Sequence, residues 1–184
     1  MRVMNDAFVG QESTIELYAP PRSDIQRVAL TFMTRQGIYG TIKQSQQLID
    51  IPTGFGKTYC GVATTAYWKK KVIVFVPFSK LLGEWLDAFT SFTSLTKDDI
   101  MIIQGSDACD KILEGKCKDI QVFICSTDTV ASYQKRYGNI QTIEMLRATG
   151  AYIKIIDEIH RDIRAVSMIE ALSNFHTNYY MSAS

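Results

Sequence analysis

The stretch Asp50-Ile51-Pro52-Thr53-Gly54-Phe55-Gly56-Lys57-Thr58 follows a short apolar run and precedes a segment with helical periodicity. This order predicts a strand, a loop and a helix. Gly54 and Gly56 permit backbone geometry in which amide N–H groups surround a phosphate, and the N-terminus of the next helix favours an anion. Lys57 would then reach the β- and γ-phosphates of a nucleotide, and the Thr58 hydroxyl would hold Mg²⁺.

One position departs from the general phosphate-loop pattern. Ile51 stands where that pattern has its first Gly. A glycine-rich turn with a chance Lys-Thr pair is the alternative interpretation, and the strand–loop–helix context favours the phosphate loop. The residues predicted to bind the nucleotide are then Thr53, Gly54, Phe55, Gly56, Lys57 and Thr58.

Short apolar runs alternate with helical segments along the whole chain. The runs are rich in β-branched residues, which is typical of buried parallel strands joined by crossover helices. We therefore predict an α/β fold with a mainly parallel sheet and helices on both faces, in which the carboxyl ends of the strands share one edge. The predicted strands are Leu48–Ile51, Val72–Val76, Ile100–Ile103, Val122–Cys125, Ile153–Ile156 and Tyr179–Met181.

Two helices are predicted in some detail. One follows Pro77, with Ser79 as a candidate N-cap. A second covers Asn139–Ala148 and is closed by Gly150, where a left-handed residue commonly ends a helix. The first helix has an apolar face, and its aromatic residues are expected in the core rather than as platforms for stacked bases. That face contains Leu81, Leu82, Trp85, Leu86, Phe89 and Phe92.

Two carboxylates, Asp157 and Glu158, directly follow the predicted strand Ile153–Ile156. An Asp at a strand end beside a phosphate loop can hold Mg²⁺, and a neighbouring Glu can orient and deprotonate a water molecule. An acidic pair after a strand is otherwise usually a solvated turn. The presence of a phosphate loop in the same chain favours the catalytic interpretation, in which Lys57 takes part.

Composition sets limits on the class of protein. The chain has 184 residues, of which 46% are hydrophobic and 21% charged, so it can form one compact domain. A formal net charge of +1 means that any nucleic-acid contact must be local. No apolar run is long enough to span a bilayer, so we expect no membrane partner and a cytoplasmic location. No CxxC pair is present, and we expect reduced, mostly buried thiols at Cys60, Cys109, Cys117 and Cys125.

Several of these segments resemble the motifs of superfamily 2 helicases of the DExH-box type. The resemblance covers residues 22–184 and implies a RecA-like P-loop NTPase domain that binds ATP and Mg²⁺. A narrower resemblance is to phage branch-migration DNA helicases of the UvsW type. The matching segments are Pro52–Thr58 (motif I), Phe75–Leu81 (motif Ia), Cys125–Val130 (a DNA-contacting Thr motif), Asp157–His160 (motif II) and Ser182–Ser184 (motif III).

The resemblance also implies roles for individual residues. His160 would couple the ATP state to nucleic acid through Ser182 and Ser184. Gln26 would read adenine, although an ordinary exposed Gln is the alternative. The residues implied to contact a nucleic-acid backbone are Ser79, Lys80 and Thr127, of which Lys80 is equally well interpreted as a solvated surface lysine.

Two parts of the chain fall outside the resemblance or beyond its end. Residues 1–21 form an N-terminal extension or an edge element, in which Thr14–Ala19 alternates like a strand before Pro20-Pro21. The sequence stops at the third motif, before the second RecA-like domain that carries the arginine reaching the γ-phosphate in such enzymes. We therefore expect little ATP turnover from these residues alone.

The expected function is an ATP-dependent DNA helicase or translocase that contacts the phosphate backbone of DNA, and the narrower resemblance implies branched DNA. An RNA helicase or the motor subunit of a restriction system is the first alternative, because contacts to phosphates do not read the sugar. A nucleotide-gated binding module that does not hydrolyse ATP is the second, and the presence of Glu158 argues against it. A P-loop kinase would need an acceptor pocket and lid arginines that the sequence does not offer.

Overall fold

The computed structural model describes residues 7–34 and 45–183. In that part of the chain six strands form one sheet in the order β1-β6-β5-β2-β4-β3, and every neighbouring pair is parallel. The predicted strands are confirmed, and β1 and β6 begin earlier than expected. Their bounds are β1 Ser45–Asp50, β2 Val72–Val76, β3 Ile100–Ile103, β4 Val122–Ser126, β5 Ile153–Ile156 and β6 Thr177–Ser182.

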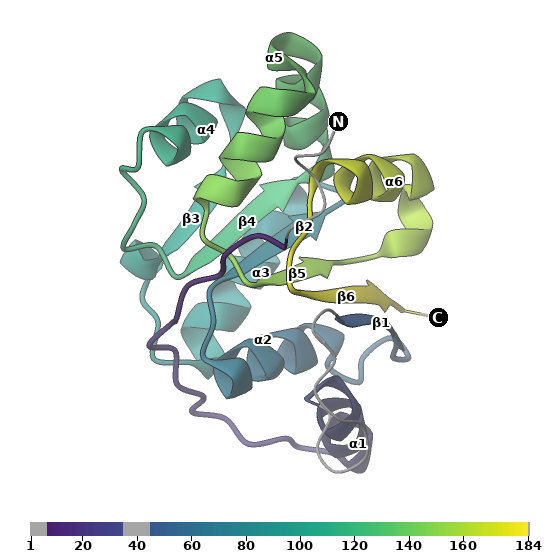
Figure 1. The fold of residues 1–184 in the computed structure, drawn as a ribbon. Helices are drawn as coiled ribbons and strands as arrows, with labels where there is room; N and C mark the ends of the chain where they lie inside the picture. The colour runs from purple at the N-terminus through teal and green to yellow at the C-terminus, as the bar shows by residue number, and fades with distance from the viewer. Residues whose placement is uncertain (1–6, 35–44, 184) are drawn as a thin grey trace.

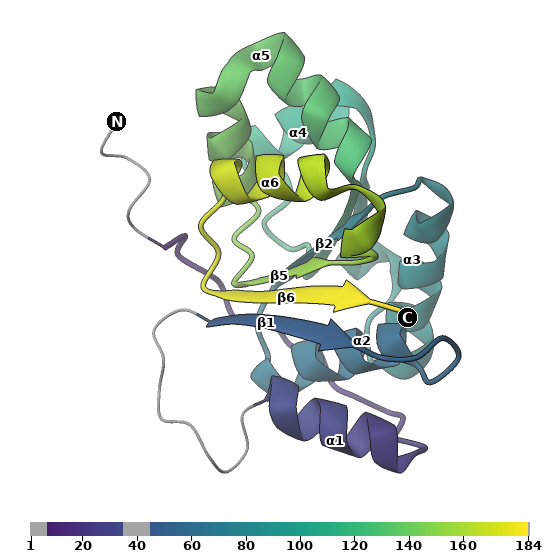
Figure 2. The same ribbon diagram turned by 90° about the vertical axis from the view of Figure 1, so that its right-hand side faces the viewer.

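Helices cover both faces of this sheet, as predicted (Figures 1 and 2). Helices α1, α2 and α3 pack on one face, and α4, α5 and α6 pack on the other. Their bounds are α1 Asp24–Met33, α2 Lys57–Trp68, α3 Lys80–Phe92, α4 Gly105–Leu113, α5 Thr127–Ala148 and α6 Ile163–Leu172, with short 3₁₀ turns η1 Lys97–Asp99 and η2 Ile159–Arg161.

The central strand β2 shows why the sheet is buried on both sides. All five of its side chains are fully buried. Val72, Val74 and Val76 belong to the core under α1–α3, whereas Ile73 and Phe75 belong to the core under α4–α6. A continuous β-branched run thus serves two cores at once, which an alternating strand could not do.

Helix α3 buries the apolar face that its sequence predicts. Trp85 and Phe89 are fully buried, and the partly buried Phe92 packs edge-on against Tyr59. The N-cap expectation for Ser79 is confirmed for its position but not for its hydrogen bonding. Ser79 occupies the N-cap position, but its backbone is already helical (φ −59°, ψ −28°) and its side chain makes no capping hydrogen bond.

Helix α5 is longer than the predicted Asn139–Ala148 because a second helical segment precedes it. The two segments meet at Gly138, whose φ of 84° and ψ of 173° break the helix. Gly150 has the expected left-handed conformation, with φ of 69°. The first segment was not predicted because its turns are mostly polar and show no clear apolar stripe.

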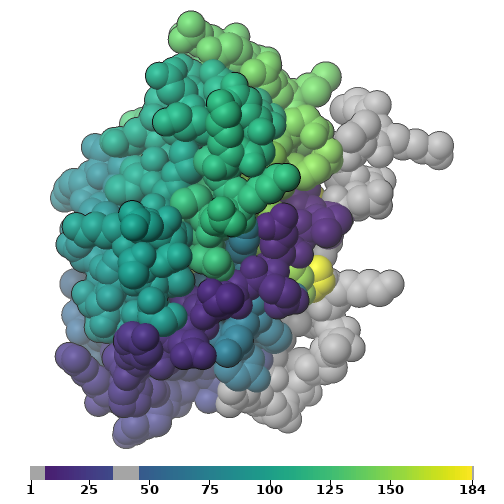
Figure 3. Space-filling view, turned by 90° about the vertical axis from the view of Figure 1, so that its left-hand side faces the viewer, coloured from purple at the N-terminus to yellow at the C-terminus, as the bar shows by residue number. Residues whose placement is uncertain are grey.

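Residues 8–19, here called the N-terminal strap, run along the amino-terminal edge of the sheet (Figure 3). The strap is not a regular strand, and residues 12 and 17 make only isolated antiparallel bridges to Lys70 and Thr93. Backbone hydrogen bonds join Phe8 to Asn174 (2.7 Å) and Gln11 to Gly150 (2.8 Å). Phe8 and Ile15 are buried, so the strap is part of the domain's core.

Two further expectations concern membranes and thiols. Among the described residues, no helix has both the length and the apolar character needed to cross a bilayer. The four cysteines are unpaired, and all except the partly buried Cys117 are buried, as expected. Burial raises the pKa of Cys60 and that of Cys109 to about 11, so both thiols stay protonated near neutral pH.

Candidate functional site

The phosphate loop joins β1 to α2 at the carboxyl edge of the sheet (Figure 2). Gly54 and Gly56 have φ of 87° and 86°, a conformation that L side chains rarely adopt. Gly56 is also the N-cap of α2 and supplies no side-chain hydrogen bond, so the first amides of the helix are left for an anion. The backbone therefore has the form that the sequence predicts for a phosphate site.

Lys57, the first residue of α2, lies against the acidic pair that follows β5. Its ammonium is 2.6 Å from Asp157 Oδ1 and forms an ion pair with Glu158 Oε1 as well. The side chains of Lys57 and Asp157 are 11% and 5% exposed, which strengthens their attraction relative to a surface pair. The structure thus brings together the three residues predicted to be catalytic.

Asp157 is held from two sides. Its Oδ1 accepts the Glu158 amide (2.9 Å) in addition to Lys57, and its Oδ2 accepts the indole N–H of Trp85 (2.9 Å). Sequence reasoning placed Trp85 in the core and missed this contact. A tryptophan that is predicted to be buried indicates that a hydrogen-bond acceptor lies nearby, because its indole N–H needs a partner in the core.

Glu158 has a left-handed backbone (φ 51°, ψ 47°), which is uncommon for a residue with a side chain. This conformation turns the chain between β5 and η2, and Glu158 is the N-cap of η2. Strained residues of this kind are common at functional sites. The side chain is 20% exposed, so solvent can reach it.

His160 lies between the acidic pair and the end of β6. Its Nδ1 is 3.0 Å from Ser182 Oγ, and its Nε2 is 3.3 Å from Glu158 Oε2. The contact with Ser182 has the geometry expected for the coupling role, and the contact with Glu158 was not anticipated. Ser184, the other expected partner, lies outside the described residues.

The donor atoms of this site fit Mg²⁺ together with a nucleotide. Carboxylate and hydroxyl oxygens, here those of Asp157 and Thr58, are ligands that Mg²⁺ prefers, and such sites use one or two carboxylates plus substrate phosphates. Within the described residues, no cluster of three or more His, Cys, Asp or Glu side chains could hold a metal on its own. The Lys57 ammonium already lies where a cation would face the carboxylates.

Gln26, on α1, contacts the phosphate loop. Its Nε2 donates to the Phe55 carbonyl (3.1 Å), and its Oε1 accepts the Arg22 amide (2.7 Å). It is 8% exposed, so it is not the ordinary exposed glutamine of the alternative interpretation. A Cβ added at Gly56 would lie 2.3 Å from Gln26 Nε2, so a side chain there would displace this amide in addition to being strained by the φ of 86°.

The three residues expected to contact nucleic acid differ in exposure. Ser79 and Lys80 are exposed at the amino-terminal end of α3. Thr127 is only 4% exposed, and its hydroxyl has no hydrogen-bond partner among the described residues. Thr127, the first residue of α5, is therefore buried rather than on the surface, and its contact with nucleic acid stays a prediction.

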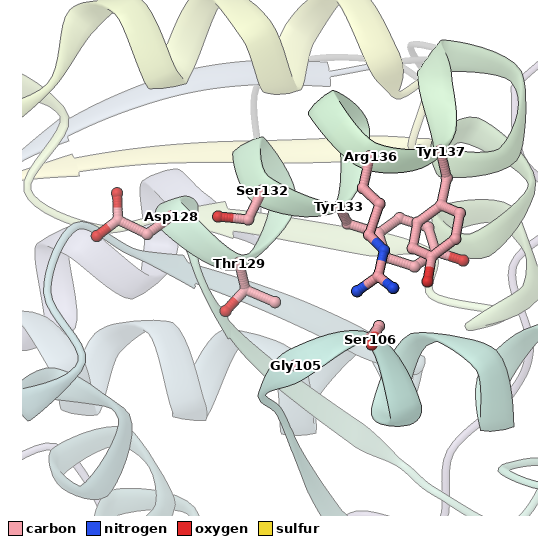
Figure 4. A pocket seen from close by; sticks show the side chains of 8 residues that line it. All are labelled: Gly105, Ser106, Asp128, Thr129, Ser132, Tyr133, Arg136 and Tyr137. Carbon is pink, nitrogen blue, oxygen red and sulfur yellow. The ribbon is translucent and has the colours of Figure 1, made fainter.

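A cavity of about 270 Å³ lies near Thr127, between the amino-terminal ends of α4 and α5 (Figure 4). Asp128 stands at one end and Arg136 at the other, so the charges of its lining oppose each other. Arg136 also lies over the ring of Tyr137. The cavity opens beside the expected nucleic-acid side of the sheet and is lined by Gly105, Ser106, Asp128, Thr129, Ser132, Tyr133, Arg136 and Tyr137.

Comparison with known proteins gives one matching family and several solved structures with a similar fold. The profile of the family described as "Type III restriction enzyme, res subunit" (ResIII) matches residues 12–183. No curated protein matches the chain. The crystal structure of the UvsW helicase from bacteriophage T4 is similar, with a TM-score of 0.60 and 19% identity over 92% of this chain and 56% of that chain.

Two other solved structures are similar to the same extent. A second structure of T4 UvsW has a TM-score of 0.58 and 19% identity over 92% of this chain and 32% of that chain. The Hef helicase domain of Pyrococcus furiosus has a TM-score of 0.60 and 15% identity over 86% and 32%. At these identities the likeness shows the fold, a RecA-like helicase domain. The chain spans 56% of one matched structure and 32% of the others.

Proposed function

Because the chain belongs to the ResIII family and is a helicase-type ATP-binding domain of superfamily 2, we propose that it powers an ATP-dependent DNA helicase or translocase. The observation that carries the proposal is the contact of Lys57 with both Asp157 and Glu158 at the mouth of the phosphate loop. These residues come from segments that are distant in the sequence and meet at one edge of the sheet.

The cluster supports a division of labour in hydrolysis. Lys57 would bind the terminal phosphates, and Thr58 and Asp157 would hold Mg²⁺. When bound, the metal ion would neutralise part of the charge of the phosphates. Glu158 accepts a proton from the attacking water, since its side chain is partly exposed and lies beside His160. Gln26 completes the nucleotide site next to the loop and recognises adenine.

Ser79 and Lys80 would contact the DNA. Both are exposed at the same edge of the sheet as the phosphate loop, and neither takes part in the cluster of Lys57, Asp157 and Glu158. A hydroxyl and a cation bind the sugar-phosphate backbone without reading the bases. Branched DNA is the preferred substrate in this proposal, on the basis of the likeness to T4 UvsW.

The family description favours a second candidate, the motor subunit of a restriction system. Both candidates use the same ATP site, and they differ in what the rest of the protein does to DNA. A competition titration of forked DNA, linear duplex DNA and duplex RNA against the full-length protein separates the substrates. Preference for linear duplex DNA supports the restriction motor, and preference for RNA contradicts both candidates.

The ATP site itself is tested by calorimetry on the 184-residue chain. Lys57→Ala is expected to weaken Mg·ATP binding roughly tenfold to a hundredfold, because the terminal phosphates lose a charge-assisted hydrogen bond. Lys116→Ala, which removes an exposed lysine paired with Glu114, is the matched control and should bind like the wild type. Equal affinity of Lys57→Ala and the wild type would refute the assignment of this site.

A further inference from the structure

Trp85 is the one described residue of α3 that reaches the acidic pair by a hydrogen bond. Its indole N–H donates to Asp157 Oδ2 over 2.9 Å, and the side chain is 1% exposed. The other oxygen of the same carboxylate, Oδ1, faces Lys57 and the Glu158 amide. Oδ1 of Asp157 is thus bound by groups of the ATP site. Oδ2 is bound by Trp85 of α3, a helix whose first turn lies outside that site.

The ring of Trp85 is also wedged against α2, the helix that begins with Lys57 and Thr58. A Cβ added at Gly61 would lie 2.7 Å from Cη2 of the indole and 3.4 Å from Ile155 Cδ1. Gly61 therefore gives the ring its place between α2 and β5. Movement of the indole requires movement of its neighbours, because a close-packed interior has no free volume at this point.

Helix α3 connects this contact to the proposed DNA side. Ser79 and Lys80 stand at its amino-terminal end, and Trp85 lies five residues after Lys80, about 7.5 Å along the helix axis. A helix of this length moves as a rigid unit. A shift of a few tenths of an ångström at Lys80 is therefore passed to the indole, and a hydrogen bond weakens over that range of distance and angle.

We propose that Trp85 is a positioning residue that couples nucleic-acid binding at the start of α3 to the orientation of the Asp157 carboxylate. The proposal rests on the proposed function, because it needs a nucleic acid at Ser79 and Lys80 and Mg·ATP at Asp157. Nucleic acid that moves α3 changes the direction of Asp157 Oδ2, and Mg·ATP that moves Asp157 acts back on α3. Such coupling is reciprocal by thermodynamic necessity.

The competing explanation is that Trp85 only fills the core. Removal of the indole N–H would then lower stability without changing how the two ligands influence each other. Trp68 offers a matched control on α2, because its indole N–H donates to the hydroxyl of Tyr179 (3.0 Å), away from the acidic pair. Trp68→Phe and Trp85→Phe both lose one indole hydrogen bond, and only the second loses a bond to Asp157.

The test measures the dissociation constant of Mg·ATP by calorimetry on the full-length protein, with and without saturating DNA. A catalytically silent background, Glu158→Gln, keeps the nucleotide intact during the titration. The ratio of the two constants is the coupling factor. Trp85→Phe is expected to reduce a wild-type factor about tenfold, or to unity if that factor is smaller, which is the size of one hydrogen bond to a charged group. Trp68→Phe is expected to leave the factor unchanged.

A second variant covers the case in which Trp85→Phe does not fold. Gly61→Ala keeps the indole but places a methyl group against it, and it is expected to reduce the same factor. A coupling factor at the wild-type value in either folded variant overturns the proposal and leaves the proposed function intact. A wild-type protein that binds Mg·ATP but whose affinity does not respond to DNA contradicts the proposed function, and the coupling role falls with it.

Discussion

Lys57 and Asp157 lie 2.6 Å apart, Nζ to Oδ1, and the same ammonium also pairs with Glu158. A lysine that serves the phosphates must exchange these carboxylates for phosphate oxygens when a nucleotide enters. Glu158→Gln removes one of its two competing partners and removes the proposed base, but leaves Asp157 in place. ATP binding and ATP turnover should therefore respond to this change in different ways.

We expect Glu158→Gln in the full-length protein to bind Mg·ATP at least as tightly as the wild type and to lose at least a hundredfold in kcat. Steady-state ATPase assays and calorimetry measure the two effects. Glu84→Gln, an exposed change on α3, is the control and should keep both values. A kcat within a few-fold of the wild type would exclude Glu158 as the base.

The contact between His160 and Ser182 predicts a defect in coupling rather than in binding. Ser182→Ala removes the 3.0 Å contact to Nδ1, and we expect stimulation of the ATPase by DNA to fall about fivefold, the size of one neutral hydrogen bond. ATP affinity without DNA should not change. Ser167→Ala on α6, whose hydroxyl bonds only its own helix at Ile163, is the matched control. Equal losses in both variants would contradict a specific role for Ser182.

Lys80 predicts a change in the salt dependence of DNA binding. Each phosphate neutralised contributes about one unit to the slope of log affinity against log salt. Lys80→Ala should lower that slope by about one, equally for unrelated DNA sequences. Lys97→Ala removes an exposed lysine at the opposite edge of the sheet, just before β3, and should leave the slope unchanged. A slope that Lys80→Ala does not alter would remove this lysine from the DNA contact.

The buried Thr127 gives a contrasting case. Thr127→Val keeps the shape of the side chain and removes a hydroxyl that has no partner in the described structure. We therefore expect DNA affinity to stay at the wild-type value and stability to stay equal or rise slightly. Weaker DNA binding by Thr127→Val would show that the hydroxyl becomes exposed in the complex.

The buried ion pair of Lys154 and Glu170 predicts a large effect on stability. Lys154 is 1% exposed in the middle of β5, and burial lowers its pKa while Glu170 raises it. Glu170→Gln leaves this ammonium without its counter-charge, at a cost of about 3 kcal/mol in the free energy of unfolding. Lys154→Met removes the charge as well as the pair and should cost much less.

The same variant has a predictable pH dependence. In Glu170→Gln the pKa of Lys154 in the folded state falls further below 10.5, its ordinary value. As pH rises between the folded and unfolded pKa values, the folded protein releases this proton while the unfolded chain keeps it, so stability rises with pH. Urea unfolding at several alkaline pH values should show the gap to the wild type narrowing as pH approaches 10.5.

The strands and the motif loops could be predicted because each is encoded within a few consecutive residues. Continuous β-branched runs such as Val72–Val76 admit one interpretation, and parallel strands place the loops after them at one edge. The bond from Trp85 to Asp157 could not be located in this way, because its partners are separated by 72 residues. The burial of Thr127 was missed for a similar reason, since position after a strand does not determine which way a side chain points.

The course of the N-terminal strap and the break at Gly138 could not be predicted from the sequence either. The alternation of Thr14–Ala19 suggested a strand but not its neighbours, and the strap is instead held by backbone hydrogen bonds to segments such as Gly150 and Asn174. Gly138 within a polar stretch gave no sign that two helical segments would meet there. Local propensity fails where tertiary contacts decide the conformation.

The arrangement of the strap and of β1 has a consequence for synthesis of the protein. Phe8 bonds to Asn174, and β1, which leads into the phosphate loop, pairs within the described residues with β6 alone, at Thr177–Ser182. Contacts between such distant parts of a chain make folding slow, and domains are synthesised from the N-terminus onward. The segment that would bind ATP therefore leaves the ribosome before β2, β3, β4 and β5, and only then does its neighbour β6 follow. Until β6 emerges, the nascent chain exposes β1 as an unpaired, partly apolar strand. During that time chaperones can bind β1.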